Sequence, residues 1–231
     1  VDEAFGHMQD KVRSLGLSVQ SAPGFDAAFT AQDQSALQRL LNDQFHQYFV
    51  TAGEVRLIQL RLFDPAFTLR AAATEGGRSF PATRAACPGL LERAVARRGP
   101  ERLQFISALC ADPAPLYSLI VPIGGLRLRG YVEVVADPSY SLESLEKALG
   151  MPLNLASVAG SPLFRSSNWP TATAMDSMLV VDYPVRGEDG ESVLQVTLLS
   201  DVAELKAQLG ATLRNILLLA SLVTVLVAAA A

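Results

Sequence analysis

Few side chains in this 231-residue chain are of the types that carry catalysis. The two histidines, His7 and His46, both fall in stretches with helical periodicity, and the aromatic neighbours of His46 favour a structural role. No spacing typical of a zinc or calcium site occurs, and no G-x-S-x-G motif marks a serine nucleophile. The sequence GGLRLRG joins two predicted strands, whereas a nucleotide-binding glycine loop joins a strand to a helix. We therefore expect no enzyme active site, metal or cofactor in this segment.

The cysteines allow one covalent cross-link. Cys87 and Cys110 are the only two in the chain. A pair fits a single disulfide in an oxidising compartment, which would add about 3 kcal/mol of stability for a loop of this size. Two inert, buried thiols fit the same sequence equally well, so both alternatives stay open.

The remaining chemistry is binding. The candidates for a first, distal ligand pocket are Arg84, Ser107, Tyr117 and Glu133. Ser107 and Glu133 interrupt otherwise apolar strands, and a polar group on such a face needs a partner. That partner could be a ligand in a pocket over the sheet. In the alternative, the two residues pair with one another or face solvent.

Two further polar stretches could bind ligands. Trp169 is the candidate for a second, proximal pocket, together with its neighbours Arg165, Ser166 and Asn168. The alternative is a surface loop with one packed aromatic side chain. Arg127 and Arg129 alternate in a turn and could attract an anion, although a solvated turn explains them as well.

Composition limits the possible partners. Half of the residues are hydrophobic and 18% are charged, so the chain can bury a core and is not disordered. The net charge of −4 argues against nucleic acid or anionic lipid as a partner. The length allows one or two domains.

Hydrophobic periodicity predicts two helices and then an antiparallel sheet. Apolar residues recur every three or four positions over residues 1–22 and 35–50, and Asp33 is placed to cap the second helix. From Val55 the period changes to two, which predicts strands. The pattern places Val55, Leu57, Gln59, Arg61 and Phe63 on one face of the first strand. The other predicted strands here are 67–74, 103–110, 115–123 and 130–137, with a helix over 89–98, and their short connections favour antiparallel pairing.

A second, smaller set of strands follows a connecting helix. We expect that helix over 141–150, with Ser141 as N-cap and Gly150 at its end. The predicted strands are 152–158, 161–167, 178–185 and 191–201, and GEDG at 187–190 is a hairpin turn. Asp201 should cap a last helix over 202–215.

The end of the sequence predicts a membrane anchor. Residues 216–231 read ILLLASLVTVLVAAAA, without a charge. A membrane-spanning helix needs about 20 apolar residues, so we predict a transmembrane helix that the end of the sequence cuts short. A buried helix of a soluble core is the alternative, although such a helix normally has a polar face.

These elements predict an α+β fold: a long N-terminal helix, two antiparallel-sheet modules that resemble PAS-like modules, and a terminal transmembrane helix. The expected units are an N-terminal helical region (1–54), a membrane-distal module (55–140), a linker helix (141–150), a membrane-proximal module (151–200), a juxtamembrane helix (201–215) and the truncated transmembrane helix (216–231).

Three stretches carry a resemblance to a known family. They are VRLIQLRLFDPAFTLRAAA, YSLIVPIGGLRLRGYVEVVAD and MLVVDYPVRGEDGESVLQVTLLSD. With the order of helices around them, they resemble the double Cache sensor domains of bacterial chemoreceptors, sensor histidine kinases and diguanylate cyclases. One departure concerns the amino-acid-binding subclass. That subclass has an Arg and an aromatic pair after the first hairpin, whereas the stretch RSFPATRAACPG here contains no Trp or Tyr.

The resemblance implies a ligand-responsive input domain. Residues 1–215 would lie in the periplasm, anchored in the bacterial inner membrane by the C-terminal helix, and would signal through that helix to a cytoplasmic output module. The partner would be an unknown small molecule or a periplasmic protein, and the wide apolar stripe of the N-terminal helix would support a homodimer. The alternative is a membrane-tethered structural or interaction domain without a small ligand.

Overall fold

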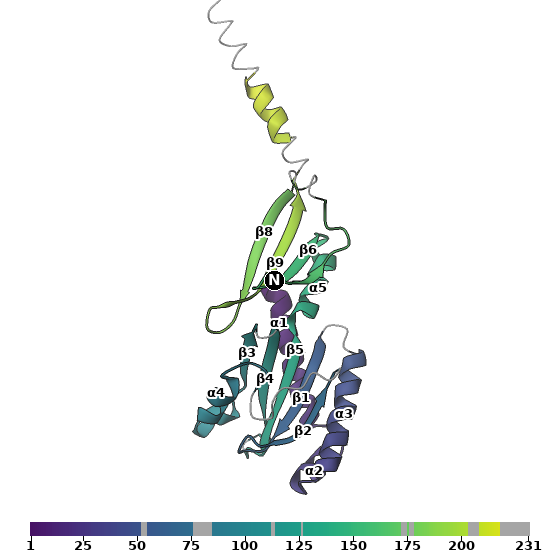
Figure 1. The fold of residues 1–231 in the computed structure, drawn as a ribbon, viewed down its shortest axis with the longest axis vertical. Helices are drawn as coiled ribbons and strands as arrows, with labels where there is room; N and C mark the ends of the chain where they lie inside the picture. The colour runs from purple at the N-terminus through teal and green to yellow at the C-terminus, as the bar shows by residue number, and fades with distance from the viewer. Residues whose placement is uncertain are drawn as a thin grey trace, which may run out of the picture.

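Two antiparallel sheets follow one another along the length of the molecule, with the N-terminus at their junction (Figure 1). The computed structural model describes residues 1–51, 55–75, 85–111, 114–125, 127–171, 175, 178–202 and 208–217. The helices are α1 (Asp2–Gln20), α2 (Phe25–Thr30), α3 (Gln34–Thr51), α4 (Leu90–Ala96) and α5 (Pro138–Leu149), with a 3-10 turn η1 (Gly99–Leu103).

The larger sheet has five strands in the order β2-β1-β5-β4-β3. They are β1 (Arg56–Phe63), β2 (Leu69–Thr74), β3 (Ile106–Cys110), β4 (Leu116–Ile123) and β5 (Gly130–Asp137), and every neighbouring pair is antiparallel. The smaller sheet has the order β7-β6-β9-β8. Its strands are β6 (Leu153–Ser157), β7 (Pro162–Arg165), β8 (Met178–Arg186) and β9 (Ser192–Asp201). The predicted α+β architecture with two antiparallel sheets is therefore confirmed.

Both faces of the five-stranded sheet are covered. Helix α1 packs across β4 and β5, and α3 packs against β1 and β2. Gly16 of α1 approaches the sheet so closely that an added Cβ would lie 2.6 Å from the Val121 side chain. The opposite face carries a second apolar cluster with α4 and the residues just before it. This double cover explains why nearly all of β1 is buried.

The predicted face assignment of β1 is wrong at its beginning. Strand β1 carries a bulge, because Leu57 pairs with Ala136 and Gln59 with Val135, which leaves Ile58 as the extra residue. Leu57 therefore packs in the same apolar cluster as Leu60, on the α1 side of the sheet. A bulge cannot be seen in the alternation of residue types alone.

One predicted helix cap needs correction. Helix α5 begins at Pro138, not at Ser141, because the side chain of Asp137 accepts a hydrogen bond from the Ser139 N–H at 2.9 Å. Asp201 is the last residue of β9, and residues 203–207, which include the start of the helix it was predicted to cap, lie outside the described part of the chain. By contrast, the Asp33 carboxylate accepts the Ala36 N–H at 3.0 Å, as predicted for an N-cap.

Residues 208–217 form a helix that continues away from the four-stranded sheet (Figure 1). Among the described residues, no helix is long and apolar enough to cross a bilayer. Residues 218–231, which make up most of the predicted transmembrane segment, lie outside the described part of the chain.

Candidate ligand-binding site

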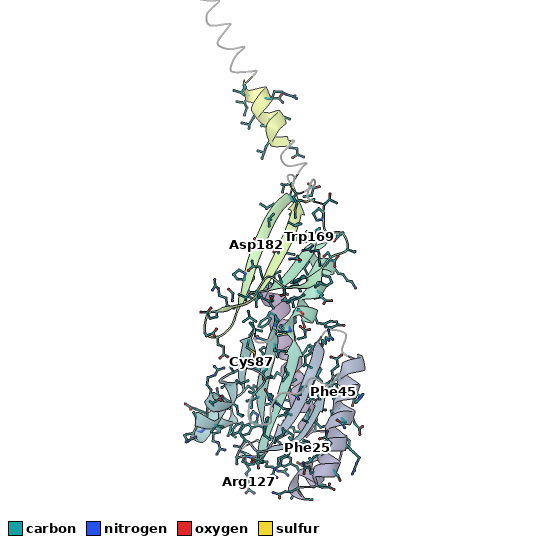
Figure 2. The ribbon with its side chains drawn as sticks, viewed as in Figure 1. Phe25, Phe45, Cys87, Arg127, Trp169 and Asp182 are labelled. Atoms are coloured by element: carbon teal, nitrogen blue, oxygen red, sulfur yellow. A yellow bond between two sulfur atoms is a disulfide. The ribbon has the colours of Figure 1, made fainter. Side chains whose placement is uncertain are left out.

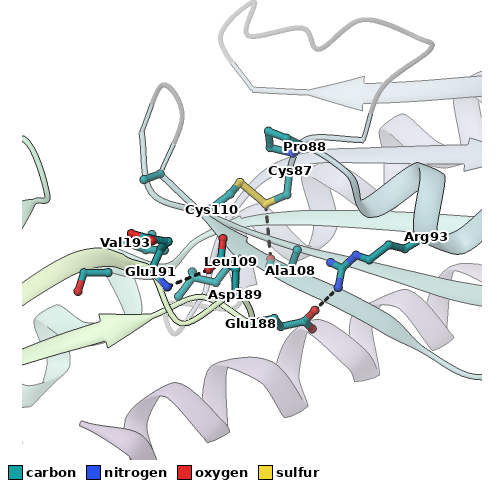
Figure 3. Close-up of a pocket in the computed structure, with 12 residues that line it drawn as sticks. Cys87, Pro88, Arg93, Ala108, Leu109, Cys110, Glu188, Asp189, Glu191 and Val193 are labelled. Carbon is teal, nitrogen blue, oxygen red and sulfur yellow. Dashed lines mark hydrogen bonds and ion pairs between the residues drawn. A yellow bond between two sulfur atoms is a disulfide. The ribbon is translucent and has the colours of Figure 1, made fainter.

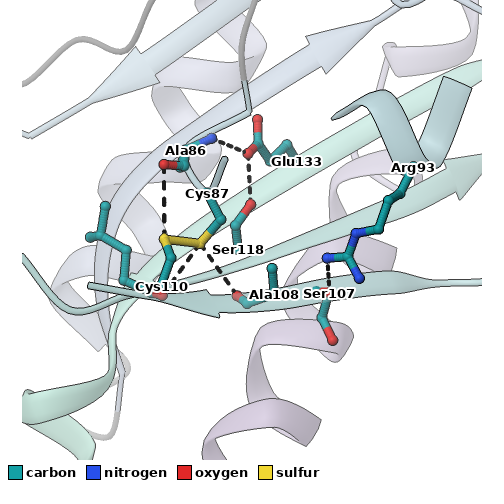
Figure 4. The surroundings of a disulfide bond; sticks show 9 residues. Ala86, Cys87, Arg93, Ser107, Ala108, Cys110, Ser118 and Glu133 are labelled. Atoms are coloured by element: carbon teal, nitrogen blue, oxygen red, sulfur yellow. Dashed lines mark hydrogen bonds between the residues drawn. A yellow bond between two sulfur atoms is a disulfide. The ribbon is translucent and has the colours of Figure 1, made fainter. Parts of the chain in front are cut away.

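A buried ion pair lies at the centre of the five-stranded sheet. Arg61 of β1 and Glu133 of β5 are direct partners in the strand register, and both are 0% exposed. The Arg61 Nε donates to Glu133 Oε2 at 2.7 Å, and Nη2 also contacts this oxygen. The other carboxylate oxygen, Oε1, accepts the Ser118 hydroxyl at 2.6 Å and the Ala86 N–H at 2.9 Å. Figure 4 shows Ala86 and Ser118 converging on this carboxylate.

These contacts explain how charged groups can be buried here. Moving two charges out of water is costly, and it is tolerated only where close geometry and further hydrogen bonds satisfy both groups. Neighbouring strands supply the geometry, since Glu133 lies opposite Ile120 on β4 and Ser118 is two residues along on the same face. We call Arg61, Ser118, Glu133 and the Ala86 N–H the buried polar network.

Gln59 lies beside this network, two residues before Arg61 on the same strand, and is 2% exposed. Within the described part of the chain, its Oε1 has no hydrogen-bond partner. A buried acceptor without a partner costs free energy, which a ligand carrying an N–H or O–H donor would recover.

A disulfide closes the same face of the sheet. Cys87, just before α4, is bonded to Cys110 at the end of β3, and the Cα atoms are 5.5 Å apart. The Cys87 sulfur also lies 3.5 Å from the Ala108 carbonyl oxygen (Figure 4). Of the two alternatives that the sequence left open, the structure has the disulfide. It fixes the segment that carries Ala86 and α4 to the edge of the sheet.

A cleft of about 580 Å³ lies between this disulfide and the β8–β9 hairpin of the other sheet (Figure 3). Arg93 of α4 forms an ion pair with Glu188 at the hairpin tip. Gly187 packs so tightly that an added Cβ would lie 2.8 Å from the Leu109 carbonyl oxygen of β3. The α4 side of the larger sheet is thus in direct contact with the smaller sheet.

The predicted distal pocket residues do not lie together. Ser107 and Tyr117 face α1, where the Tyr117 ring meets the Phe5 ring edge-on at 5.9 Å. Burial raises the pKa of the Tyr117 hydroxyl, while a hydrogen bond with the Ser107 side chain opposes the shift. Glu133 lies on the opposite face, so Ser107 and Glu133 do not pair with one another, which was one of the possibilities in the alternative. Arg84 lies outside the described residues.

Trp169 packs within its own loop. Its ring is half-buried, with the guanidinium carbon of Arg165 5.6 Å from the ring centroid. The backbone N–H of Trp169 donates to the Ser166 carbonyl at 3.1 Å, and the buried Ser166 hydroxyl accepts the backbone N–H of Leu153 at 2.7 Å. These contacts fit the alternative of a packed surface loop.

Sequence reasoning missed Arg61, Ser118 and the Arg93–Glu188 contact. One signal was available, because Gln59 and Arg61 interrupt the apolar run of β1 at a spacing of two, as Glu133 does in β5. Nothing in the sequence indicates that α4 meets the distant hairpin.

The arrangement of helices and sheets is similar to that of a periplasmic domain of known structure. The periplasmic domain of Vibrio cholerae LuxQ superposes with a TM-score of 0.53 and 16% identity, covering 86% of this chain and 95% of that one. The expected resemblance is therefore confirmed at the level of the fold. No protein-family model matches the chain, and no curated protein sequence matches it significantly.

Two further structures superpose with lower TM-scores. The sensor domain of the V. cholerae histidine kinase DctB gives a TM-score of 0.47 and 12% identity, covering 86% of this chain and 93% of that one. The ligand-binding domain of the Pseudomonas aeruginosa chemoreceptor PctC, in complex with GABA, gives 0.40 and 16%, covering 84% and 89%.

Proposed function

We propose that this chain is the ligand-sensing input module of a bacterial membrane receptor. Residues 1–215 lie in the periplasm, and the C-terminal helix enters the inner membrane and carries the signal to a cytoplasmic output module. The fold shared with the LuxQ periplasmic domain supports this role. Two copies pair through α1. An open groove of about 700 Å³ lies between α1 and α5.

The observation that carries the proposal is the buried Gln59 oxygen without a partner beside the buried polar network. The ligand binds on this face, beneath the segment fixed by the disulfide. It donates an N–H or O–H to Gln59 Oε1. A carboxylate ligand is disfavoured beside Arg61, because Glu133 already holds that guanidinium.

A screen of the full chain in detergent tests the site. We expect at least one amine, amide, purine or sugar to raise the melting temperature by several degrees at saturating concentration. Gln59→Leu should abolish that shift without lowering the stability of the free protein, because it removes an acceptor that has no partner. Ser107→Ala, on the other face of the same sheet, is the matched control and should keep the shift. Failure of every compound would contradict ligand sensing.

The hairpin contact provides a route for the signal. A ligand beneath α4 that prefers one position of this helix shifts the population of that position. Through Arg93 and Glu188 the change reaches the tip of the β8–β9 hairpin, and β9 leads towards the helix at residues 208–217.

Hydrogen exchange tests this route. In the wild type, the ligand should change amide exchange both around α4 and at the hairpin tip, residues 187–191. Glu188→Gln should keep the change around α4 and lose it at the hairpin. Glu191→Gln removes the same charge from the same hairpin, without an ion partner in the described part of the chain, and should behave like the wild type. Equal behaviour of the two variants would contradict the route.

The alternative is a tethered domain that docks another protein. One observation favours it: the edge strand β8 exposes three consecutive apolar residues, Leu179, Val180 and Val181, at 53%, 50% and 46%. Exposed apolar edges of this kind mark interaction sites. A silent ligand screen would favour this function.

A further inference from the structure

A second cavity lies at the end of the five-stranded sheet that is remote from the smaller sheet. It has a volume of about 400 Å³, within the range of small-molecule sites. Phe25 and Arg127 mark this end of the molecule in Figure 2. The lining residues used below are Thr30, Gln32, Gln34, Asp64, Arg70 and Arg129. We call this cavity the tip cleft; its lining shares no residue with the cleft at the disulfide.

Helix α2 holds Arg129 in place on one side of the tip cleft. The Arg129 Nη1 donates to the Asp26 carboxylate at 2.6 Å, and Nη2 donates to the Thr30 hydroxyl at 2.6 Å. The guanidinium carbon also lies 5.5 Å from the centroid of the Phe29 ring. The Arg129 side chain nevertheless keeps 31% of its surface exposed, so the guanidinium is positioned before any ligand arrives.

Arg70, from β2, lines the same cleft and is only partly used. Its Nη2 donates to Asp64 Oδ2 at 2.7 Å, and its side chain is 39% exposed. Among the described residues this is its single side-chain hydrogen bond, and a guanidinium has five N–H donors. Asp64 is largely occupied, since its Oδ1 also accepts the Ala66 and Thr68 N–H groups at 2.8 and 2.9 Å.

The charges in the tip cleft select among anions. Burial raises the pKa of Asp64, but hydrogen bonds from Thr68, Arg70 and Ala66 outweigh it and leave the pKa below its usual value. Asp64 is therefore ionised at neutral pH, and Asp26 lies at the rim beside Arg129. These carboxylates repel a dianion such as phosphate more strongly than a monocarboxylate. The exposed side chains of Gln32 and Gln34 provide donors and acceptors for hydroxyl groups, whereas the Thr30 hydroxyl already donates to the Asp26 carbonyl at 2.7 Å.

Two loops at the tip cleft adopt a backbone that is rare for residues other than glycine. Gln32, between α2 and α3, has a φ of 53°, and Phe67, in the β1–β2 turn, has a φ of 60°. Such conformations cost free energy and cluster at functional sites. Gln32 in this conformation sits directly after α2 and contributes to the cleft wall.

We propose that the tip cleft binds a hydroxylated monocarboxylic acid. The carboxylate accepts N–H donors of Arg70 and Arg129, and the hydroxyl groups bond to Gln32 and Gln34. This site is independent of the proposed sensing site beneath α4. It gives the same module a second input at its outermost end.

Titration of the full chain with gluconate and lactate tests the proposal, with isothermal calorimetry as the readout. We expect saturable binding of gluconate, and weaker binding of phosphate at equal concentration. Arg70→Gln should weaken gluconate binding about tenfold or more, because charge-assisted hydrogen bonds are lost. Arg127→Gln removes the same charge from an exposed position near the cleft and should leave binding unchanged.

A second variant separates binding from folding. Gln32→Gly relieves the left-handed backbone and so preserves stability, but it removes the amide and should weaken gluconate binding. The absence of saturable binding by either acid at millimolar concentration would overturn the proposal. Equal affinities of the wild type and Arg70→Gln would overturn it too. Neither result would affect the Gln59-dependent ligand response.

Discussion

Replacing Glu133 by glutamine is expected to lower the free energy of unfolding by about 3–5 kcal/mol, the usual cost of leaving a buried charge without its partner. Arg61 is 0% exposed and cannot turn to water for compensation. A neutral amide in place of the carboxylate also forces an N–H group into a site built from donors, namely Arg61, Ser118 and the Ala86 N–H. Urea titration, with the slope compared between variants, measures the loss.

Two controls isolate the charge. The double variant Arg61→Met with Glu133→Leu removes both ions and should recover most of the stability, because apolar residues of similar volume replace a buried pair well. Glu75→Gln breaks a surface pair with Arg56, whose side chain is 48% exposed, and should cost less than about 1 kcal/mol. A loss for Glu133→Gln no larger than that for Glu75→Gln would show that the buried polar network does not hold the sheet together.

The second large effect concerns the disulfide. Replacing both Cys87 and Cys110 by alanine should destabilise the protein by about 3 kcal/mol, since the two cysteines are 23 positions apart in the sequence and the disulfide closes a loop of that size. The segment before α4 would gain freedom in the unfolded chain, and in the folded protein the amide of Ala86 would be held less firmly. Denaturation in urea, with and without a reductant, measures the difference.

The reductant itself supplies the control. It should destabilise the wild type to about the level of the double alanine variant and leave that variant unchanged. If the reductant had no effect on a wild type shown by thiol titration to be reduced, the disulfide would contribute nothing to stability. Either outcome is independent of the ligand screen.

The strongly periodic elements could be predicted from the sequence. Apolar spacing predicted α1 and α3, and alternation with short connections predicted the antiparallel pairing of β1 to β5. The start of α5 was missed because Asp137 and Pro138 also end a strand pattern, and only the folded backbone shows the cap. The bulge at Ile58 was missed because one unpaired residue leaves the apolar run intact.

The candidate site was predictable only in part. Glu133 stood out as a charge in an apolar strand. Arg61 gives the same signal but was missed, and the pairing of the two depends on the register between residues that lie 72 positions apart in the chain. Ser107 and Tyr117 also interrupt or border apolar strands, yet they face α1. Which face a polar residue takes depends on strand order and bulges, which residue types do not specify.

Helix α1 runs from the junction of the two sheets to the far end of the five-stranded sheet (Figure 1). Near its start, the Tyr183 hydroxyl of β8 donates to the Asp2 carboxylate at 2.5 Å, and at its end the Gln20 side chain accepts the Gly124 N–H at 3.4 Å. Its 19 residues make a rod of about 28 Å. Because α1 lies close to the sheet at Gly16, a tilt of about 5° around that point would displace the other end of the helix by about 2 Å. A small rotation at the outer end of the five-stranded sheet would then become a linear shift beside β8, next to β9, the strand that leads towards residues 208–217.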